Sequence, residues 1–474
     1  MKSNSFSRPI AAALAAAFIC VSQTACVAQK TGTTAKPPDT TEAVTQWLAA
    51  HAIPLSSVEA GAGFDDLRPL ERILKDTRIV ALGETSHGTR EIFQFKHRMV
   101  EFLVTRMGFD ALTIEASYPA CMKINDYVVY GKGDPAQALA GQGFSQFDSQ
   151  EILALIEWLR RHNSALPQAQ RVRLLGHDMQ TQLQPAIDGI VEYLQRVAPD
   201  HVAEAKAALA PFEAGRGGIG ALPAEEQVTS QARLQALHSF LAARRDEFVQ
   251  RTTAWEFDVV LLYARVMAQN ASFIIAVAKN KQPPGVYEAY GLRDAYMAEN
   301  VGAQLRMLGP NARIIVSSHN GHVQTGHWGG GIPSLSGASI AAMGEFLRDA
   351  YGPAYYVIGS DFNRGAFQAL GDAGLREFVL PPAPQGSLAW YLSAAGRARE
   401  ARNYFVDFRW APTRGPVAQW LASPVPITVL TGAFADGLRR EQIQAPIMLR
   451  QYFDAMVFME ETTPARSNPK SSGN

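Results

Sequence analysis

Cysteine is scarce in this sequence, which excludes a fold held together by disulfides. Only three cysteines occur in 474 residues. Cys20 and Cys26 fall in an apolar N-terminal stretch, so Cys121 is the only one in the body of the chain. A disulfide framework needs paired cysteines in the folded part. Stability must therefore come from burial, and we expect Cys121 to be a packed thiol rather than a nucleophile.

An excess of charge of one sign is also missing. The chain carries 44 basic and 44 acidic side chains, for a formal net charge of zero. Nucleic-acid binding requires clustered Lys and Arg against the phosphates, so nucleic acid is not expected as the main partner. The length allows one large or two ordinary domains. A hydrophobic content of 47% fits a soluble globular enzyme.

Two well-known hydrolase signatures are absent. We find no Gly-x-Ser-x-Gly elbow at a strand end, which disfavours a serine hydrolase and leaves Ser86 and Ser318 as the serines best placed to be nucleophiles. We also find no His-Glu-x-x-His helix of the kind that binds zinc. No metal ligand is assigned and no cofactor is expected, but a divalent metal that activates water stays open.

The N-terminus has the pattern of a secretory signal. Lys2 and Arg8 precede an apolar run over residues 10–21, and small residues follow up to Ala28. This pattern predicts a signal peptide over residues 1–28 and export to the periplasm, and the run is short for a membrane span. Cys26 could accept a lipid anchor, and cleavage after Ala28 explains the same residues without one.

Beyond the signal, we expect a single folded unit. Residues 29–41 are predicted to be a disordered tether, residues 42–464 an α/β domain without a transmembrane segment, and residues 465–474 a disordered tail.

The folded part alternates apolar runs with amphipathic helical patterns. Short runs end near residues 82, 114, 175 and 316. A helical pattern over 90–107 joins the first two in a β-α-β unit, whose two strands we expect to pair in parallel. Further strands are expected over 355–359, 365–369, 428–430 and 456–458. These features predict an α/β fold with a mostly parallel central sheet flanked by helices. The helical periodicity over residues 185–281 predicts a large helical insertion that packs over the sheet or covers the site.

Acidic and imidazole side chains follow three of the apolar runs. They are Glu84 and His87, Glu115, and His319 and His322. The carboxyl ends of parallel strands meet at one edge of a sheet, so we expect these groups to lie together. An imidazole can take a proton from water near neutral pH, and a carboxylate can hold it in the right tautomer. The pattern favours an enzyme.

Each of these residues also has an unreactive explanation. Glu84 could cap the helix that begins at Arg90, and the histidines could belong to hydrogen-bonded loops. An unpaired buried carboxylate is costly, so Glu115 could form a salt bridge with Lys96, Arg98 or Arg293. Asp178 follows the third apolar run and is expected at the same edge, where it could orient a histidine. We expect His97, His162 and His327, which fall on helices or a loop, to be surface residues.

Several motifs together resemble the erythromycin esterase family. They span roughly residues 70–460, in order along the chain. The most specific are the turn Gly-Glu-Thr-Ser-His-Gly-Thr at 83–89 and the run His-Asn-Gly-His-Val at 319–323. The others are Thr-Ile-Glu-Ala at 113–116, Gly-His-Asp-Met-Gln at 176–180 and Arg-Asp-Ala-Tyr-Met-Ala-Glu-Asn at 293–300.

The resemblance implies a hydrolase that opens the lactone ring of a macrolide antibiotic. Carried over to this chain, it implies that His87 activates water, that Glu84 and Glu115 support it, and that His319 and His322 complete the site, one of them stabilising the oxyanion. We further expect Asp178 and Arg293 to contact a small-molecule ester substrate, and Trp255 to belong to the wall of its cleft.

The family resemblance leaves two alternatives open. Its members include proteins named for polysaccharide (succinoglycan) biosynthesis, and both metal-independent and metal-sensitive members have been described. The same residues could therefore serve a metal-dependent hydrolase of another ester or saccharide of the cell envelope. The chain could also be an exported binding protein that holds a ligand without turning it over.

Overall fold

The computed structural model describes residues 40–213, 218–279, 285–328 and 340–469. The predicted signal peptide, with Cys20 and Cys26, lies outside the described residues, as do residues 29–39 of the predicted tether. The last two tether residues already belong to the helix α2 (Thr40–His51).

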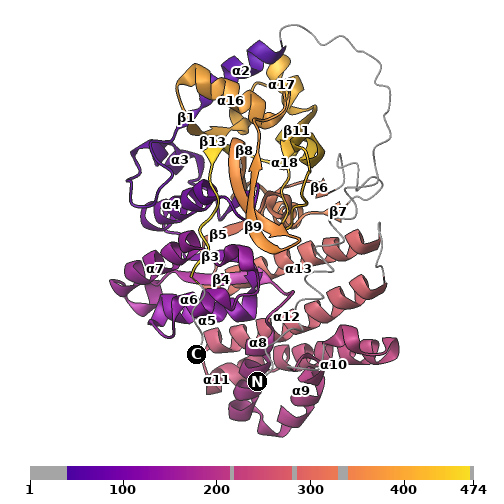
Figure 1. Ribbon diagram of the computed structural model, residues 1–474. Coiled ribbons are helices and arrows are strands. Elements are labelled where there is room, and N and C mark those ends of the chain that lie inside the picture. Colours follow the sequence, from indigo (N-terminus) through magenta and orange to yellow (C-terminus); the bar gives the residue numbers. More distant parts are fainter. Residues whose placement is uncertain (1–39, 214–217, 280–284, 329–339, 470–474) are drawn as a thin grey trace.

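A nine-stranded sheet forms the centre of the molecule (Figure 1). Strands β13, β8, β2, β5, β3 and β4 are parallel neighbours in that order, and β10, β1 and β9 add antiparallel pairs. The expected α/β fold with a mostly parallel sheet is therefore confirmed. In chain order the strands are β1 (Ile53–Pro54), β2 (Ile79–Glu84), β3 (Ala111–Ser117), β4 (Arg173–Asp178), β5 (Ile314–His319), β8 (Tyr355–Gly371), β9 (Gly374–Leu380), β10 (Asn403–Asp407) and β13 (Ala455–Thr462).

Alternate residues of the central strands enter two separate cores. In β2, Ile79 and Ala81 face one core while Val80 and Leu82 face the other, as the two-residue period of a strand requires. Helices α4 (Arg90–Met107) and α7 (Gln150–Ser164) cover the second face, and α4 begins and ends where its periodicity predicts. Both faces of the sheet are thus buried, which explains why its strands read as continuous apolar runs.

The remaining helices and strands complete these layers. Among them are two small antiparallel pairs, β6 with β7 and β11 with β12. The bounds are α3 (Arg68–Ile73), α5 (Tyr118–Tyr130), α6 (Pro135–Ala140), α14 (Asn320–Val323), β6 (His327–Trp328), β7 (Ile340–Ala341), α15 (Met343–Tyr351), α16 (Leu388–Arg399), α17 (Pro416–Leu421), β11 (Pro424–Thr428), β12 (Gln444–Met448) and α18 (Leu449–Tyr452).

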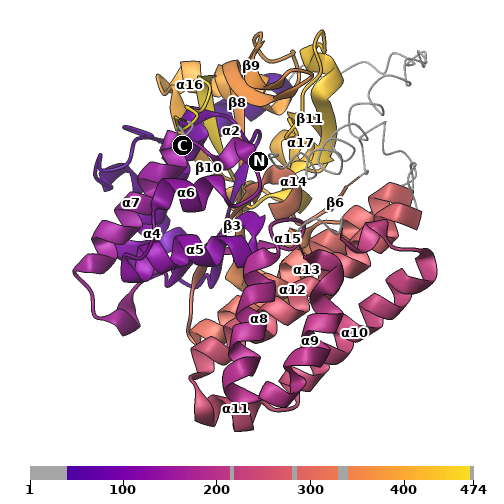
Figure 2. The same cartoon turned by 60° about the horizontal axis from the view of Figure 1, so that its bottom comes forward.

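The long connection from β4 to β5 is helical. It holds α8 (Gln184–Val197), α9 (Val202–Leu209), α10 (Ala224–Ala242), α11 (Arg245–Arg251), α12 (Ala254–Lys279) and α13 (Gly285–Leu308). Figure 2 shows these helices gathered on one side of the molecule. They follow β4, the edge strand of the sheet. The predicted helical segment is therefore real, and α13 extends it as far as β5.

Helices α12 and α13 run along β4 in opposite directions. Trp255 at the start of α12 stacks on Arg173 at the start of β4, and Asn270 farther along bonds the carbonyl of Met179 just beyond the strand. On α13, Gln304 reaches back to the carbonyl of Gly176. The start of α12 thus lies at the amino-terminal edge of the sheet, and its middle lies at the carboxyl-terminal edge.

Helix α12 is also long and apolar enough to cross a membrane, the only such helix among the described residues. Its most apolar window is 61% buried inside the fold. It packs against α8, α10 and α13. Its apolar character is therefore explained by its place in the core of the helical region.

Two expectations about strand pairing are wrong. Strands β2 and β3 are parallel but not neighbours, because β5 lies between them. The strands expected over 355–359 and 365–369 are one strand, β8. Gly365 has a φ of +127°, and at this residue β8 passes from its pairing with β13 to its pairing with β9. A change of partner within one strand explains why the sequence pattern breaks there.

Three expectations near the surface also need correction. The strand expected over 428–430 ends at Thr428 and belongs to the separate β11–β12 pair. His97 is buried, only 7% exposed, rather than on the surface. The described part of the predicted tail is folded: Ala465 is buried, and the Arg466 carbonyl accepts a hydrogen bond from the amide of Gln150. Residues 470–474 lie outside the described residues.

Candidate active site

The turn after β2 presents His87 at the carboxyl-terminal edge of the sheet. Its two glycines are required by close packing: a Cβ atom on Gly83 would overlap the side chain of Asn320, and one on Gly88 would overlap the backbone of Gln368. The amide of Thr85 donates to Ser360 Oγ at 2.9 Å. The turn is therefore clamped between α14 and β8, and its shape is set by contacts far away in sequence.

The carboxylate of Glu84 contacts both the imidazole of His87 and the buried ammonium group of Lys96. Its Oε1 lies 2.6 Å from His87 Nδ1, and its Oε2 accepts a hydrogen bond from Lys96 Nζ on α4. Lys96 also donates to Ser317 Oγ at 3.0 Å. Burial raises the pKa of Glu84, but the charge of Lys96 and the bond to His87 outweigh it and lower that pKa. Glu84 is therefore an anion.

This contact determines which nitrogen of a neutral His87 carries the hydrogen. A carboxylate only accepts, so Nδ1 holds a hydrogen in this contact, and in the neutral imidazole the lone pair is on Nε2. No hydrogen bond within the described residues engages His87 Nε2. The side chain is 15% exposed, whereas that of Glu84 is 1% exposed. The His87 ring is thus oriented by Glu84 and is partly open to solvent.

Aromatic rings hold His87 from two sides. Phe147 meets it edge-on, with ring centroids 5.4 Å apart, and His319 lies 5.1 Å away. These contacts limit rotation of the His87 ring.

Glu115 connects the end of β3 to the end of β5. Its Oε2 accepts a hydrogen bond from the backbone amide of His319 at 2.9 Å, and its Oε1 lies 3.1 Å from Arg293 Nη2 and 3.2 Å from His322 Nε2. Burial raises the pKa of Glu115, but His322 and the other nearby positive groups hold it well below its usual range. The salt bridge with Arg293, one of the unreactive explanations for Glu115, is thus present.

His319 is neutral, and both of its ring nitrogens form hydrogen bonds. Its Nδ1 accepts from the amide of Gly321 at 3.2 Å, so Nε2 carries the hydrogen and donates to the carbonyl of Leu430 at 2.9 Å. Burial lowers the pKa of His319 to about 3, and a positive charge on His87 acts in the same direction. His319 therefore ties the end of β5 to the loop after β11.

His322 lies between two carboxylates and a guanidinium. Its Nδ1 lies 2.8 Å from Asp294 Oδ1, and its Nε2 lies 3.2 Å from Glu115 Oε1 and 2.9 Å from Arg293 Nη1. Burial and Arg293 lower the pKa of His322, but Asp294 and Glu115 outweigh them and raise the pKa to about 9. The pKa values of the two imidazoles of this turn are therefore shifted in opposite directions.

Asp178 and Arg293 lie in the interior. Asp178 is completely buried, and its Oδ2 accepts from Arg293 Nη2 at 2.6 Å while its Oδ1 accepts from the amide of Met179. It does not contact a histidine. Arg293 is 5% exposed and bonds Glu115 as well. The pair holds α13 against the strand ends, so we do not assign it the substrate contact expected from the sequence.

Trp255 does not belong to this cluster. It stacks under the Arg173 guanidinium, 3.4 Å from the ring centroid, at the amino-terminal edge of the sheet. The cluster lies at the other edge, and β4 spans about 3.3 Å per residue between them. The sequence showed the aromatic residue but not the direction in which α12 runs.

The serines near the strand ends are buried, and their hydroxyl groups form hydrogen bonds within the fold. Ser318 Oγ lies 2.9 Å from His177 Nε2, but both residues are completely buried, and burial lowers the pKa of His177 to about 4. Ser86 Oγ accepts from the amide of Gly88 at 3.1 Å. Neither hydroxyl faces a substrate. Cys121 is a buried thiol without a disulfide, as expected, and burial raises its pKa.

The carboxylates at the strand ends are paired with positively charged or imidazole groups. Glu84 binds Lys96, and Glu115 binds Arg293 and His322. In the part of the chain that the structure describes, no three side chains of His, Cys, Asp or Glu are grouped as metal ligands would be.

Two participants were missed or misplaced from sequence. Lys96 was considered only as a partner of Glu115, although it lies on the apolar stripe of α4 between Ile92 and Met99 and is 3% exposed. A lysine within an apolar stripe signals a buried carboxylate nearby. No role is predicted for Asp294 from the sequence. Its place beside Arg293 in the motif at 293–300 is the one indication that it belongs to the site.

Comparison with known proteins identifies the family. The family model for erythromycin esterase matches residues 104–462. Erythromycin esterase type II of Escherichia coli is 24% identical over 388 residues, covering 77% of this chain and 89% of that protein. The matched range contains Glu115, Arg293, His319 and His322 but begins after Glu84 and His87.

Solved structures share the fold. A Bacillus cereus protein superimposes with a TM-score of 0.79 at 24% identity, covering 90% of this chain and 99% of that one. A succinoglycan biosynthesis protein superimposes with a TM-score of 0.77 at 21% identity, covering 91% and 100%. At these identities the two structures show only that the fold is shared. The family assignment rests on the family model, which covers most of the chain. The chain belongs to the erythromycin esterase family.

Proposed function

We propose that this protein hydrolyses a carboxylic ester with a water molecule activated by His87. The observation that carries the proposal is the 2.6 Å contact between His87 Nδ1 and Glu84, with Glu84 anchored in turn by Lys96. In the neutral imidazole this arrangement leaves the lone pair on His87 Nε2, and the side chain is 15% exposed. A base fixed in this way can remove a proton from water at neutral pH.

The reaction then needs two proton transfers. His87 Nε2 takes a proton from water as the water oxygen attacks the ester carbonyl, and the carbonyl oxygen becomes an oxyanion. The imidazolium formed is stabilised by Glu84. When the tetrahedral intermediate collapses, the bond to the alkoxy oxygen breaks and His87 returns the proton to that oxygen. A carboxylic acid and an alcohol leave, and the base is restored.

A positive group near the carbonyl oxygen lowers the barrier of such a reaction. We assign this role to the field of His322, whose pKa is raised to about 9 and whose side chain is 10% exposed. His319 is less suited, because its one N–H already donates to Leu430. The supporting observation is thus the opposite pKa shift of two histidines that are three residues apart.

For the substrate we propose the lactone ring of a macrolide. Support comes from the erythromycin esterase of Escherichia coli, which is 24% identical to this chain over most of both sequences. The N-terminal pattern further leads us to propose that the protein acts after export, in the periplasm. The alternative is another ester or saccharide of the cell envelope, for which the similar fold of the succinoglycan biosynthesis protein is the support.

The test compares purified wild-type protein with His87→Ala on erythromycin and a panel of simple esters, with products identified by mass spectrometry. We expect hydrolysis by the wild type and a loss of about 10²–10⁴-fold or more in the variant, the size of a general-base contribution. The melting temperature should hardly change. His51→Ala, on the exposed surface of α2, is the matched control and should keep full activity.

Each other outcome has a definite meaning. Retained activity in His87→Ala would remove His87 as the base, and an unfolded variant would make the residue structural. Hydrolysis of esters other than erythromycin would keep the chemistry and replace the substrate. Activity that vanishes on exhaustive chelation and returns with a divalent metal would establish the metal-dependent alternative. Tight ligand binding without turnover of any ester would establish a binding protein.

A further inference from the structure

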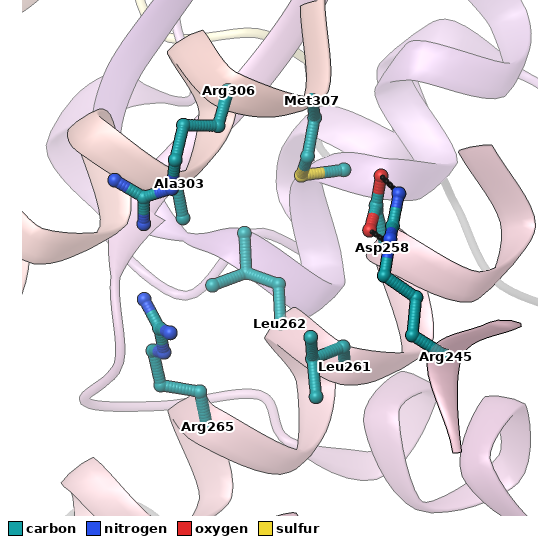
Figure 3. Close-up of a pocket in the computed structure, with 8 residues that line it drawn as sticks. All are labelled: Arg245, Asp258, Leu261, Leu262, Arg265, Ala303, Arg306 and Met307. Atoms are coloured by element: carbon teal, nitrogen blue, oxygen red, sulfur yellow. Dashed lines mark hydrogen bonds and ion pairs between the residues drawn. The ribbon is translucent and has the colours of Figure 1, made fainter. Parts of the chain in front are cut away.

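A hollow lies between α11, α12 and α13, far from His87. Its volume is about 320 Å³. The lining residues come from the start of α11, the first half of α12 and the end of α13, and α13 is followed by the first residues of β5. The hollow therefore lies toward the amino-terminal edge of the sheet, whereas the candidate active site occupies the carboxyl-terminal edge. The residues that line it are Arg245, Asp258, Leu261, Leu262, Arg265, Ala303, Arg306 and Met307 (Figure 3).

The charges of this hollow are unbalanced. Its one carboxylate, Asp258, is bound by Arg245 through two nitrogens, one of them at 3.3 Å. Arg265 and Arg306 project to the other side of the hollow, away from that pair (Figure 3). Within the described residues, no hydrogen bond or ion pair joins either guanidinium to a carboxylate. A guanidinium stays charged at any physiological pH, so the two cannot relieve their repulsion by losing a proton.

The nearest acidic influence on Arg265 does not cancel this charge. Glu299 attracts Arg265 from beyond ion-pair distance, and its Oε2 already accepts a hydrogen bond from Gln269 at 3.1 Å. Burial and the neighbouring Arg306 lower the pKa of Arg265 against that attraction. Two neighbouring guanidinium groups are the arrangement that binds a carboxylate or a phosphate in fork geometry.

The rest of the wall is apolar. Leu261, Leu262 and Met307 lie between the two charged sides in Figure 3, and Ala303 adds a small surface beside them. Methionine adapts to ligands of different shape. The volume is at the small end of the range for ligand sites, so a macrolide is not the expected occupant.

We propose that this hollow binds a small amphipathic oxyanion, a carboxylate or phosphate monoester whose head pairs with Arg265 and Arg306 and whose short chain lies on the leucines and Met307. The site is separate from the proposed hydrolysis and does not depend on it. The two guanidinium groups set the charge of the head, and the apolar wall sets the need for a chain.

The test uses calorimetric titration of the full protein with sodium octanoate and hexyl phosphate. Butyrate lacks most of the chain and octan-1-ol lacks the charge, so both should bind at least about tenfold more weakly than octanoate. The ratio of octanoate to hexyl phosphate affinity tells which head the site prefers. Equal binding of octanol and octanoate, or no binding of either anion, would overturn the proposal.

Variants locate the binding. Arg306→Gln and Arg265→Gln should each weaken octanoate binding about tenfold. Asp258→Asn should strengthen it, because a competing negative charge is removed. Arg399→Gln, on the exposed end of α16, is the matched control and should leave affinity unchanged. Binding should persist in His87→Ala. Equal affinities in wild type, Arg265→Gln and Arg306→Gln would place the ligand elsewhere and overturn the assignment, provided circular dichroism shows all variants folded.

Discussion

At the scale of single residues, the candidate site depends on each ionisable group having a fixed partner. Glu84 lies between His87 and Lys96, and Glu115 lies between Arg293 and His322. These groups are nearly all buried, where an unpaired charge would be very costly. His87 is the exception, since one of its nitrogens is left without a partner in the described structure. This asymmetry is what distinguishes a reactive base from the structural ion pairs around it.

Glu84→Gln tests the orienting role of the carboxylate. The amide keeps the size of the side chain but can donate to Nδ1, which would move the lone pair away from Nε2. We expect kcat for the best ester substrate to fall by about 10²–10⁴-fold, as for other oriented histidines. Steady-state kinetics measures this. Glu71→Gln, at a solvent-exposed ion pair with Arg106, is the control. A loss below about threefold would contradict the role.

The raised pKa of His322 predicts a dependence of stability on pH. Its value of about 9 in the folded protein lies above the ordinary value of 6.5. A raised pKa stabilises the fold fully below pH 6.5, and that stabilisation is lost as pH rises through 9. The free energy of unfolding should fall by the order of 3 kcal/mol over this range. Urea unfolding at several pH values should show this slope in wild type and lose it in His322→Gln. Equal slopes would contradict the assignment.

At the scale of elements, the turn between β2 and α4 is built to hold His87 by contacts from other strands. The carbonyl of Gly88 accepts hydrogen bonds from the amides of Gln368 in β8 and Ala465 in the C-terminal segment. Gly88 can make both only because it has no side chain, as a Cβ would overlap Gln368. The glycine is therefore needed for close approach between segments.

Gly88→Ala should disturb both stability and activity. The added methyl group must push β8 or the turn aside, which we expect to cost about 1–3 kcal/mol of unfolding free energy and to displace His87. Thermal melting and ester hydrolysis measure the two effects. Gly302→Ala in α13 is the control: its Cβ would meet only ordinary contacts, so this variant should be neutral or slightly more stable. Wild-type behaviour of Gly88→Ala would contradict the packing argument.

At the scale of the whole molecule, the site is assembled from segments far apart in the chain. It takes groups from β2 and α4, from the end of β3, from α13, from the turn after β5 and from the loop after β11. The C-terminal segment joins this assembly by backbone hydrogen bonds. The carbonyls of Thr463 and Arg466 accept from the amides of Arg90 at the start of α4 and Gln150 at the start of α7.

Truncation after Pro464 should therefore destabilise the fold. It removes the buried side chain of Ala465 and the bonds from this segment to Gly88, Asp148 and Gln150. We expect a lower melting temperature, by several degrees for a loss of about 2 kcal/mol, and lower activity because Gly88 adjoins His87. Arg466→Ala is the control, since its side chain is exposed and only its backbone is used. An unchanged melting temperature would mean that the segment is dispensable.

The sequence by itself determined the class of fold and most of the reactive groups. Alternation of apolar runs with helical patterns is a local property, and it placed α4 at its observed bounds and Glu84, His87 and Glu115 at strand ends. Because parallel strands end at a common edge, their meeting could also be predicted. The family motifs pointed to the same residues.

Only the tertiary structure decided how these groups are paired. Lys96 with Glu84, the insertion of β5 between β2 and β3, and the distance of Trp255 from the site all depend on which segments become neighbours. The charge states of His319 and His322 likewise follow from burial and from the groups around each ring. Such pairings join residues up to hundreds of positions apart, so no local pattern records them.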